Sequence, residues 1–219
     1  MDNEAQVSRR NFLRTVGAGS ALGAGGLLGA FDTIAAAPAV RAVRAWDMSW
    51  VARITRAHRV VFDVRKIDDG TPLWQATSWM QGYAETENTT DADHNVVLVL
   101  RHESVRMALN DAMWTRLTEE AGAPAKRNPW LGDDAPASPT AAGMMPTLRK
   151  LMARGVIVLA CNNALNGQTF TLTKKEGLSE AQAQSQLRAS VGEGIYVVPN
   201  GVFGVSRAQS AGCTFFLAG

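Results

Sequence analysis

Segments of apolar strand character alternate with segments of helical character along most of this chain. Runs rich in β-branched or aromatic residues, typical of buried strands, occur at residues 58–66, 95–100, 156–160, 195–198 and 213–217. Between them, helical periodicity and capping residues predict helices at about 72–87, 104–119, 146–153, 179–191 and 202–211. Residues 166–175 predict a loop or an extended segment. We therefore expect an α/β fold: a mostly parallel five-stranded sheet with helices on both faces, in three flavodoxin-like layers.

Two segments fall outside this alternation. Residues 40–56 mix arginines with apolar residues around Trp46 and Trp50, which predicts a short amphipathic arm that packs on the domain or on a partner. Residues 121–143 are rich in Pro, Ala, Gly and Asp and predict an irregular insertion at the surface, and long loops of this kind are often functional. The folded domain is expected to span residues 57–219.

The amino-terminal residues have the pattern of an export signal. The twin-arginine segment Ser8-Arg9-Arg10-Asn11-Phe12-Leu13-Arg14 is followed by a modest apolar run, and Ala37-Pro38-Ala39 offers a cleavage site. We expect residues 1–39 to be a signal peptide that engages the twin-arginine export machinery through Arg9 and Arg10. The protein is then periplasmic or otherwise exported. An uncleaved amino-terminal anchor remains the alternative.

Composition narrows the functional classes. The chain has 219 residues, 46% hydrophobic and 19% charged, with a net charge of only +2, which gives no support to nucleic-acid binding. Two cysteines are too few for a disulfide framework. The three histidines, His58, His94 and His102, lack the spacing of a metal cluster, so we expect neither a metal nor a cofactor.

Cys161 ends one of the predicted strands. It stands in the segment from Gly155 to Leu165, where an apolar run is followed at once by Asn162 and Asn163. Open α/β sheets bind ligands at the carboxyl ends of their strands, and a helix amino terminus there stabilises a thiolate. Cys161 is therefore the candidate nucleophile. The alternative is a small buried apolar residue, which is a common role for free cysteine.

Other polar residues are expected at the same edge of the sheet. With a strand order of 2-1-3-4-5, His102, Arg65 and Lys66 follow strands that end beside Cys161, with His102 about 10 Å from it. These three residues are candidate ligand-binding residues. His102 is otherwise a structural histidine that bonds to local backbone.

The two asparagines after Cys161 complete the candidate site. Asn162 and Asn163 are candidates to donate hydrogen bonds to a bound anion. Alternatively, they cap the helix that follows.

Cys213 is expected at the opposite, amino-terminal edge of the last strand. A five-residue strand spans about 17 Å, whereas the Cα atoms of a disulfide lie within about 7 Å. We therefore expect no bridge between Cys161 and Cys213 and expect Cys213 to pack in the core.

The carboxyl half resembles the DsrE/DsrF-like family of sulfur-relay proteins. The resemblance covers about residues 57–219. It rests on the helix and its stop at 148–156, on Leu159-Ala160-Cys161-Asn162-Asn163-Ala164-Leu165, on Val197-Val198-Pro199-Asn200-Gly201-Val202 and on Ala211-Gly212-Cys213. More narrowly, residues 97–102 and 109–114 resemble exported members of the family.

The resemblance implies a five-stranded α/β domain that assembles as trimers or hexamers. It also implies that Cys161 carries sulfur as a persulfide and exchanges it with a donor or acceptor protein. Arg65, Lys66 and His102 are then expected to stabilise the sulfur anion. A second function stays open: a non-catalytic oligomeric module that binds a small ligand or a partner. The sequence does not decide whether the chain is an enzyme.

Overall fold

Five parallel strands form one sheet in the computed structural model of the chain, which describes residues 46–124, 126–133 and 145–218. The predicted signal peptide and residues 40–45 of the predicted arm lie outside these residues. The predicted α/β class is confirmed, since helices and strands alternate along the domain. The strands are β1 (His58–Val64), β2 (His94–Leu100), β3 (Ile157–Cys161), β4 (Tyr196–Val198) and β5 (Thr214–Ala218).

The strand order is β4-β3-β2-β1-β5, so the expected order 2-1-3-4-5 is wrong. β2 lies between β1 and β3, where we had expected β1 to separate β2 from β3. The connections from β1 to β2, β2 to β3 and β3 to β4 each add the next strand on the same side of the sheet. The connection from β4 to β5 returns to the opposite edge, where β5 lies beside β1. Right-handed crossovers then place the last helix on the face opposite the others.

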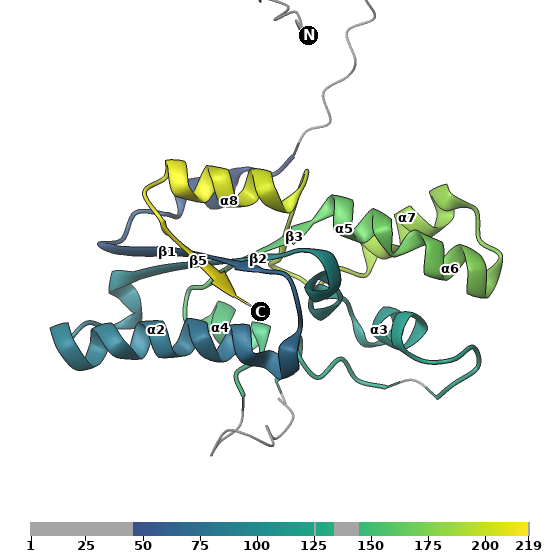
Figure 1. Cartoon of the computed structure of the whole chain (residues 1–219), viewed down its shortest axis with the longest axis horizontal. Coiled ribbons are helices and arrows are strands. Elements are labelled where there is room, and N and C mark those ends of the chain that lie inside the picture. Colours follow the sequence, from purple (N-terminus) through teal and green to yellow (C-terminus); the bar gives the residue numbers. More distant parts are fainter. Residues whose placement is uncertain (1–45, 125, 134–144, 219) are drawn as a thin grey trace, which may run out of the picture. The chain divides into compact units, whose positions relative to one another are not determined.

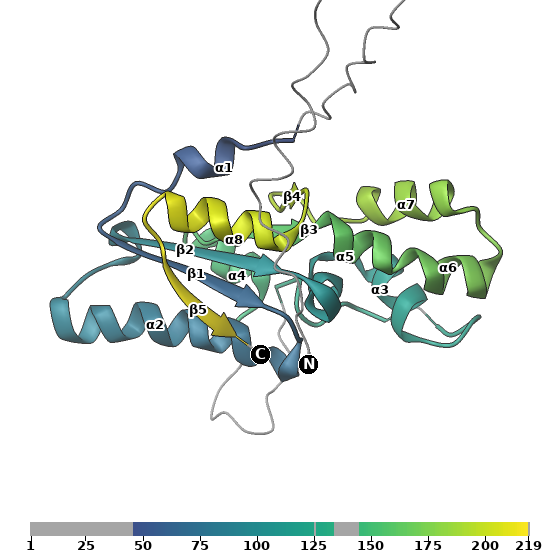
Figure 2. The same ribbon diagram turned by 45° about the horizontal axis from the view of Figure 1, so that its top comes forward.

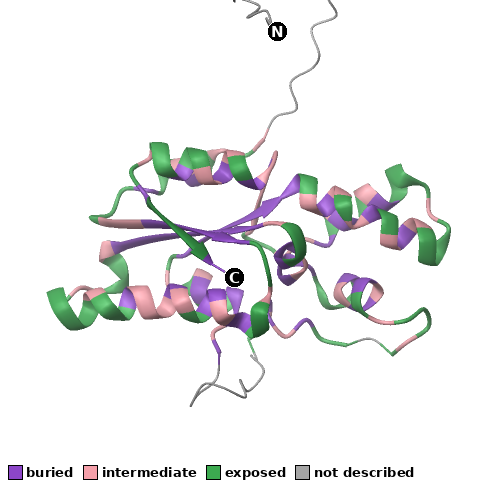
Figure 3. Ribbon diagram, in the orientation of Figure 1, coloured by how far each residue is buried: buried purple, intermediate pink, exposed green. Residues whose placement is uncertain are grey.

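Helices cover both faces of the sheet (Figures 1 and 2). One face carries α2 (Thr71–Glu87) and α4 (Leu148–Ala153), and the other carries α1 (Ser49–Ala52) and α8 (Gly201–Ser210). Phe62 packs in the core of the first face, whereas its neighbour Val61 packs in the core of the second. Figure 3 shows the resulting buried central strands. Trp50 of α1 is fully buried in the core of the second face. Of the two alternatives for the arm, packing on the domain is therefore the one that residues 46–56 follow.

The remaining helical elements are short or lie beyond the carboxyl ends of the strands. They are the 3-10 helices η2 (Asp68–Gly70), η3 (Asp91–Asp93) and η4 (His102–Ala108), and the α-helices α3 (Asp111–Thr118), α5 (Asn162–Gly167), α6 (Thr169–Glu176) and α7 (Glu180–Ala189). No helix within the described ranges is long and apolar enough to cross a membrane.

A break divides the helix predicted at 104–119 into η4 and α3. Leu109 is extended and pairs with Val191, and the backbone N–H of Asn110 donates to the carbonyl of Ser190 at 2.8 Å. The Asn110 side chain then caps α3 by accepting from the Met113 N–H at 3.0 Å. The helical spacing of apolar residues continues across the break, so the sequence gives no sign of it. The helix is interrupted by contact with residues 190–191, which are distant in sequence.

Residues 166–175 belong to α5 and α6 apart from a turn at Gln168, so the predicted loop or extended segment is wrong. The β-branched threonines of this segment favour extended backbone, but Leu172 is fully buried in the core beneath α6, and this burial outweighs the local preference. Gly177, with a φ of 68°, ends α6. Ser179 caps α7 as predicted, accepting from the Gln182 N–H at 3.3 Å.

Part of the predicted surface insertion packs into the core. Trp130 and Leu131 are buried, and the Asn128 side chain donates hydrogen bonds to the carbonyls of Met107 and Leu109 at 3.0 and 2.6 Å. A surface loop is therefore wrong for residues 128–131. Residues 134–143 of the insertion lie outside the described residues.

Candidate functional site

The helices after β3 and β4 leave the sheet toward opposite faces. Leu165 of α5 packs in the core of the α2 face, whereas Ala208 of α8 packs in the core of the other face. β3 and β4 are neighbours, so their carboxyl ends form the topological switch point at which open α/β sheets bind ligands. A cavity of about 270 Å³ lies there. The residues that line it include the polar or charged side chains of Arg101, His102, Asn163 and Asn200, the thiol of Cys161 and the backbone of Gly201.

Cys161 is the last residue of β3 and the N-cap of α5. Its Sγ accepts a hydrogen bond from the backbone N–H of Ala164 at 3.3 Å. The sulfur therefore takes the capping role that we had considered for Asn162 and Asn163. The residue is only 5% exposed, and what remains open faces the cavity.

Arg101 is fixed beside the cavity by a buried carboxylate. The side chain of Asp63, on β1, accepts from Nε and Nη2 of Arg101, the latter at 2.5 Å. Hydrogen bonding to the Asp63 carboxylate raises the pKa of Arg101, and the negative charges of Asp63 and of ionised Cys161 act in the same direction against the effect of burial. Arg101 is therefore a permanent cation held close to the sulfur.

His102 lies next to Arg101 at the cavity. Nη1 of Arg101 is 2.9 Å from Nε2 of His102. A guanidinium has no acceptor, so in a hydrogen bond between the two side chains Arg101 donates and Nε2 of His102 accepts. His102 has a φ of 52°, in the left-handed region that most residues avoid. Such strain persists where the surroundings hold it, and it is frequent at functional sites.

Buried Ser104 holds the turn that carries His102. Its Oγ donates to the carbonyl of Val64 at 2.7 Å and accepts from the backbone N–H of Arg101 at 3.0 Å. The ends of β1 and β2 are thereby joined, and the strained turn is fixed relative to the sheet.

The structure brings together only some of the predicted site residues. Cys161, His102 and Asn163 line one cavity. Arg65 and Lys66 are exposed and are not among its lining residues, because β2 separates the end of β1 from β3. Asn162 is buried, and its Oδ1 accepts from the guanidinium of Arg188 on α7.

Four residues of the site and its support were missed in the sequence. The expected strand order already placed the strands of Asp63 and Arg101 side by side, but strand order alone does not show which side chains meet across neighbouring strands, so the Asp63–Arg101 pair was not predicted. Asn200 and Gly201 belong to the site because β4 neighbours β3. The Asn200 side chain caps α8, accepting from the Phe203 N–H at 2.8 Å. A Cβ on Gly201 would lie 2.8 Å from Cδ of Arg101, so glycine permits this close approach.

Cys213 lies before the amino end of β5 and is buried in the core of the α8 face, as predicted. Burial raises the pKa of its thiol to about 11, with a small opposing effect of Arg59. Both cysteines are free. Among the residues that the structure describes, no group of three His, Cys, Asp or Glu side chains is placed to hold a metal.

Comparison with known proteins adds little. No family model matches the chain, and no curated protein matches it. A solved structure of a protein of unknown function from Methanobacterium thermoautotrophicum aligns with 73% of this chain and 98% of its own length, at 18% identity and a TM-score of 0.41. A likeness this distant carries no argument about function.

Proposed function

We propose that this chain is an exported DsrE/DsrF-like protein that carries sulfur on Cys161 as a persulfide. The observation that carries the proposal is the position of this sulfur. It lies at the switch point of the sheet, in a cavity, within the field of Arg101 and against the backbone N–H of Ala164. The short resembling segments around Cys161 and Asn200 support the same function.

The transfer is a thiol exchange without net oxidation. The Cys161 thiolate attacks the outer sulfur of a donor persulfide, a new S–S bond forms at Sγ, and the S–S bond of the donor breaks. The donor departs as a thiolate. A thiolate of the acceptor protein then attacks the outer sulfur on Cys161, which regenerates the Cys161 thiolate.

Residues around the cavity stabilise the sulfur anion in this scheme. Arg101 supplies the positive charge, and Asp63 orients it. Asn163 is exposed at the cavity, and its amide is available to donate. The first N–H groups of α8 have no partner within the helix and carry its positive dipole end. His102 lines the same cavity and contributes to the polar surroundings of the sulfur in this scheme.

Export and assembly belong to the same proposal. The twin-arginine segment with Arg9 and Arg10 directs the chain to the export machinery and to the periplasm. The edge strand β5 exposes Phe215, Phe216 and Leu217 at 49%, 42% and 54%. An uncharged apolar edge of this kind favours association with another chain, in agreement with the homo-oligomer expected from the resemblance.

Selective alkylation tests the proposal. At neutral pH we expect iodoacetamide to modify Cys161 in the native protein and to leave Cys213 untouched, because the pKa of Cys213 is raised to about 11 by burial. Peptide mass mapping reads out both sites, with the Cys161→Ser and Cys213→Ser variants as matched controls. An unreactive Cys161 in the folded protein contradicts the proposal.

A non-catalytic binding module is the second candidate. It is favoured by the low exposure of Cys161 and by its use as a helix cap, since both are features of a structural residue. This candidate expects Cys161→Ser to retain ligand or partner binding, because a serine hydroxyl also caps a helix.

A further inference from the structure

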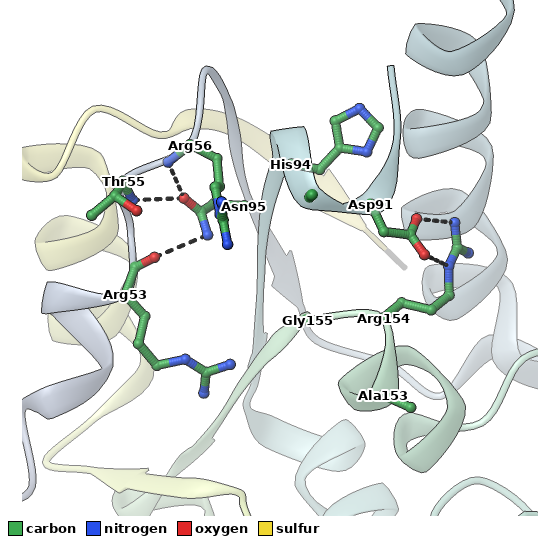
Figure 4. A pocket seen from close by; sticks show the side chains of 10 residues that line it. Arg53, Thr55, Arg56, Asp91, His94, Asn95, Ala153, Arg154 and Gly155 are labelled. Carbon is green, nitrogen blue, oxygen red and sulfur yellow. Dashed lines mark hydrogen bonds and ion pairs between the residues drawn. The ribbon is translucent and has the colours of Figure 1, made fainter. Parts of the chain in front are cut away.

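A second and larger cavity, of about 570 Å³, lies at the opposite edge of the sheet, where β2 begins. Its volume falls within the range of about 300–1,000 Å³ of small-molecule sites. Figure 4 shows the residues around it, which come from the segment after α1, from η3 and the start of β2, and from the end of α4. Neither Cys161 nor the cavity at the switch point belongs to this region.

Three arginines line this cavity, and only one of them is neutralised. Asp91 and Arg154 form a bidentate ion pair with oxygen–nitrogen distances of 2.9 and 2.7 Å. The hydrogen bond from Arg154 is the main reason why the pKa of Asp91 is lowered. Within the described part of the chain, neither Arg53 nor Arg56 pairs with a carboxylate, and the guanidinium of Arg53 donates to the hydroxyl of Tyr196 at 3.5 Å. The charged lining therefore sums to about two positive charges.

A buried amide fixes the segment that presents the two unpaired arginines. The Oδ1 atom of Asn95 accepts from the backbone N–H groups of Thr55 and Arg56 at 2.7 Å each, and its Nδ2 donates to the carbonyl of Arg53 at 3.1 Å. Asn95 is only 5% exposed and satisfies all three contacts with backbone (Figure 4). The arginines are therefore carried by a preorganised turn, which lowers the entropic cost of binding a ligand.

We infer that this cavity binds a phosphorylated small molecule, with Arg53 and Arg56 as the principal contacts and Arg154 as the opposite wall. A guanidinium matches two oxygens of a phosphate with parallel hydrogen bonds, and two uncompensated guanidinium groups match the charge of a dianion. The volume of the cavity leaves room for an organic group or a second phosphate beside the one that is bound. The inference does not rest on the proposed function of Cys161.

Isothermal titration calorimetry with pyrophosphate on the full folded chain tests the inference. We expect saturable binding that is at least about tenfold weaker in the double variant Arg53→Gln/Arg56→Gln and that weakens as salt is raised. The matched control is Arg65→Gln/Lys66→Gln, which removes two exposed cations at the other edge of the sheet and should leave the affinity within about twofold of the parent. Circular dichroism confirms that both variants are folded.

Three results of the titration would contradict phosphate binding by this cavity. Absence of binding at millimolar pyrophosphate, or equal affinity in the parent and the Arg53→Gln/Arg56→Gln variant, overturns the inference. A hexaglutamate peptide that binds more tightly than pyrophosphate, and that depends on the same two arginines, also overturns it by showing that the cavity holds an acidic polypeptide.

Discussion

At the scale of the residue, Asp63 is the polar side chain on which the candidate site depends most. It is buried, it accepts twice from Arg101, and Arg101 in turn donates to His102. Removing one member of a buried ion pair leaves the other charge without compensation, which costs far more than losing an exposed pair.

We predict that Asp63→Asn lowers the free energy of unfolding by about 2–3 kcal/mol, below the full cost of a buried pair because Arg101 is partly exposed to solvent. The exposed pair Asp91–Arg154 supplies the control, and Asp91→Asn should cost about 1 kcal/mol or less. Urea denaturation measures both. Equal decreases in the free energy of unfolding in the two variants would show that the buried pair contributes no more to stability than the exposed pair.

His94 makes the stability sensitive to mild acid. Burial lowers its pKa, as does the nearby charge of His58, while Asp91 and Asp93 oppose the shift. The unfolded chain then binds more protons than the folded one between the lowered pKa and the ordinary value of about 6.5, so stability is lost as the pH falls through this window.

We predict that the melting temperature falls as the pH is lowered from about 7.5 to about 5.5 and that His94→Gln flattens this slope. The carboxylates with lowered pKa values act in a more acidic range, below their ordinary value of 3.8 to 4.5. Thermal melts at several pH values measure the slope. An unchanged slope in His94→Gln would remove this histidine as the cause.

At the scale of the element, the close contact between α8 and the end of β2 positions the cavity. Gly201 begins α8, and the aliphatic part of Arg101 occupies the space where a Cβ would lie. Arg101 cannot move freely to make room, because Asp63 holds its guanidinium.

We predict that Gly201→Ala destabilises the fold by about 1–3 kcal/mol through overpacking. Gly82 of α2 is the matched control, because nothing outside its own stretch of helix backbone lies within 4 Å of the position that a Cβ would take there, and alanine should stabilise the helix by about 0.5–1 kcal/mol. The two substitutions therefore have opposite signs in chemical denaturation. A neutral Gly201→Ala would mean that Arg101 moves aside without cost.

Elements were predictable from the sequence where local signals and burial agreed. Ser179 caps α7 as predicted, and the valine-rich runs of β1 and β2 form the strands predicted for them. Besides residues 128–131, which pack into the core, the predictions fail at residues 109–110 and 166–175. In the last two segments a tertiary contact decides the backbone: pairing with residues 190–191 at 109–110 and burial of Leu172 at 166–175.

At the scale of the whole molecule, strand order decides which predicted site residues meet. Strand positions follow from local pattern, but their order depends on which way each crossover turns, which no local pattern encodes. Cys161 and His102 share a cavity because β2 and β3 are neighbours, and Arg65 and Lys66 are absent from its lining for the same reason.

The exposed edge of β5 gives a prediction about assembly. We expect the protein to sediment as a homo-oligomer and the double variant Phe215→Lys/Leu217→Lys to shift it toward monomers, because lysines block pairing at an edge strand. Analytical ultracentrifugation measures the change. Val202→Lys, at an exposed position on α8, is the control. A parent protein that is monomeric at all concentrations contradicts this prediction.

The intact mass of the chain purified from the periplasm decides between a sulfur carrier and an inert cysteine. We predict a mature chain that begins near Val40 and a population heavier by one sulfur atom, which returns to the unmodified mass after reduction. The extra mass should persist in Cys213→Ser and vanish in Cys161→Ser. A parent protein without added sulfur after incubation with a donor persulfide, or added sulfur that survives in Cys161→Ser, would contradict the assignment of Cys161.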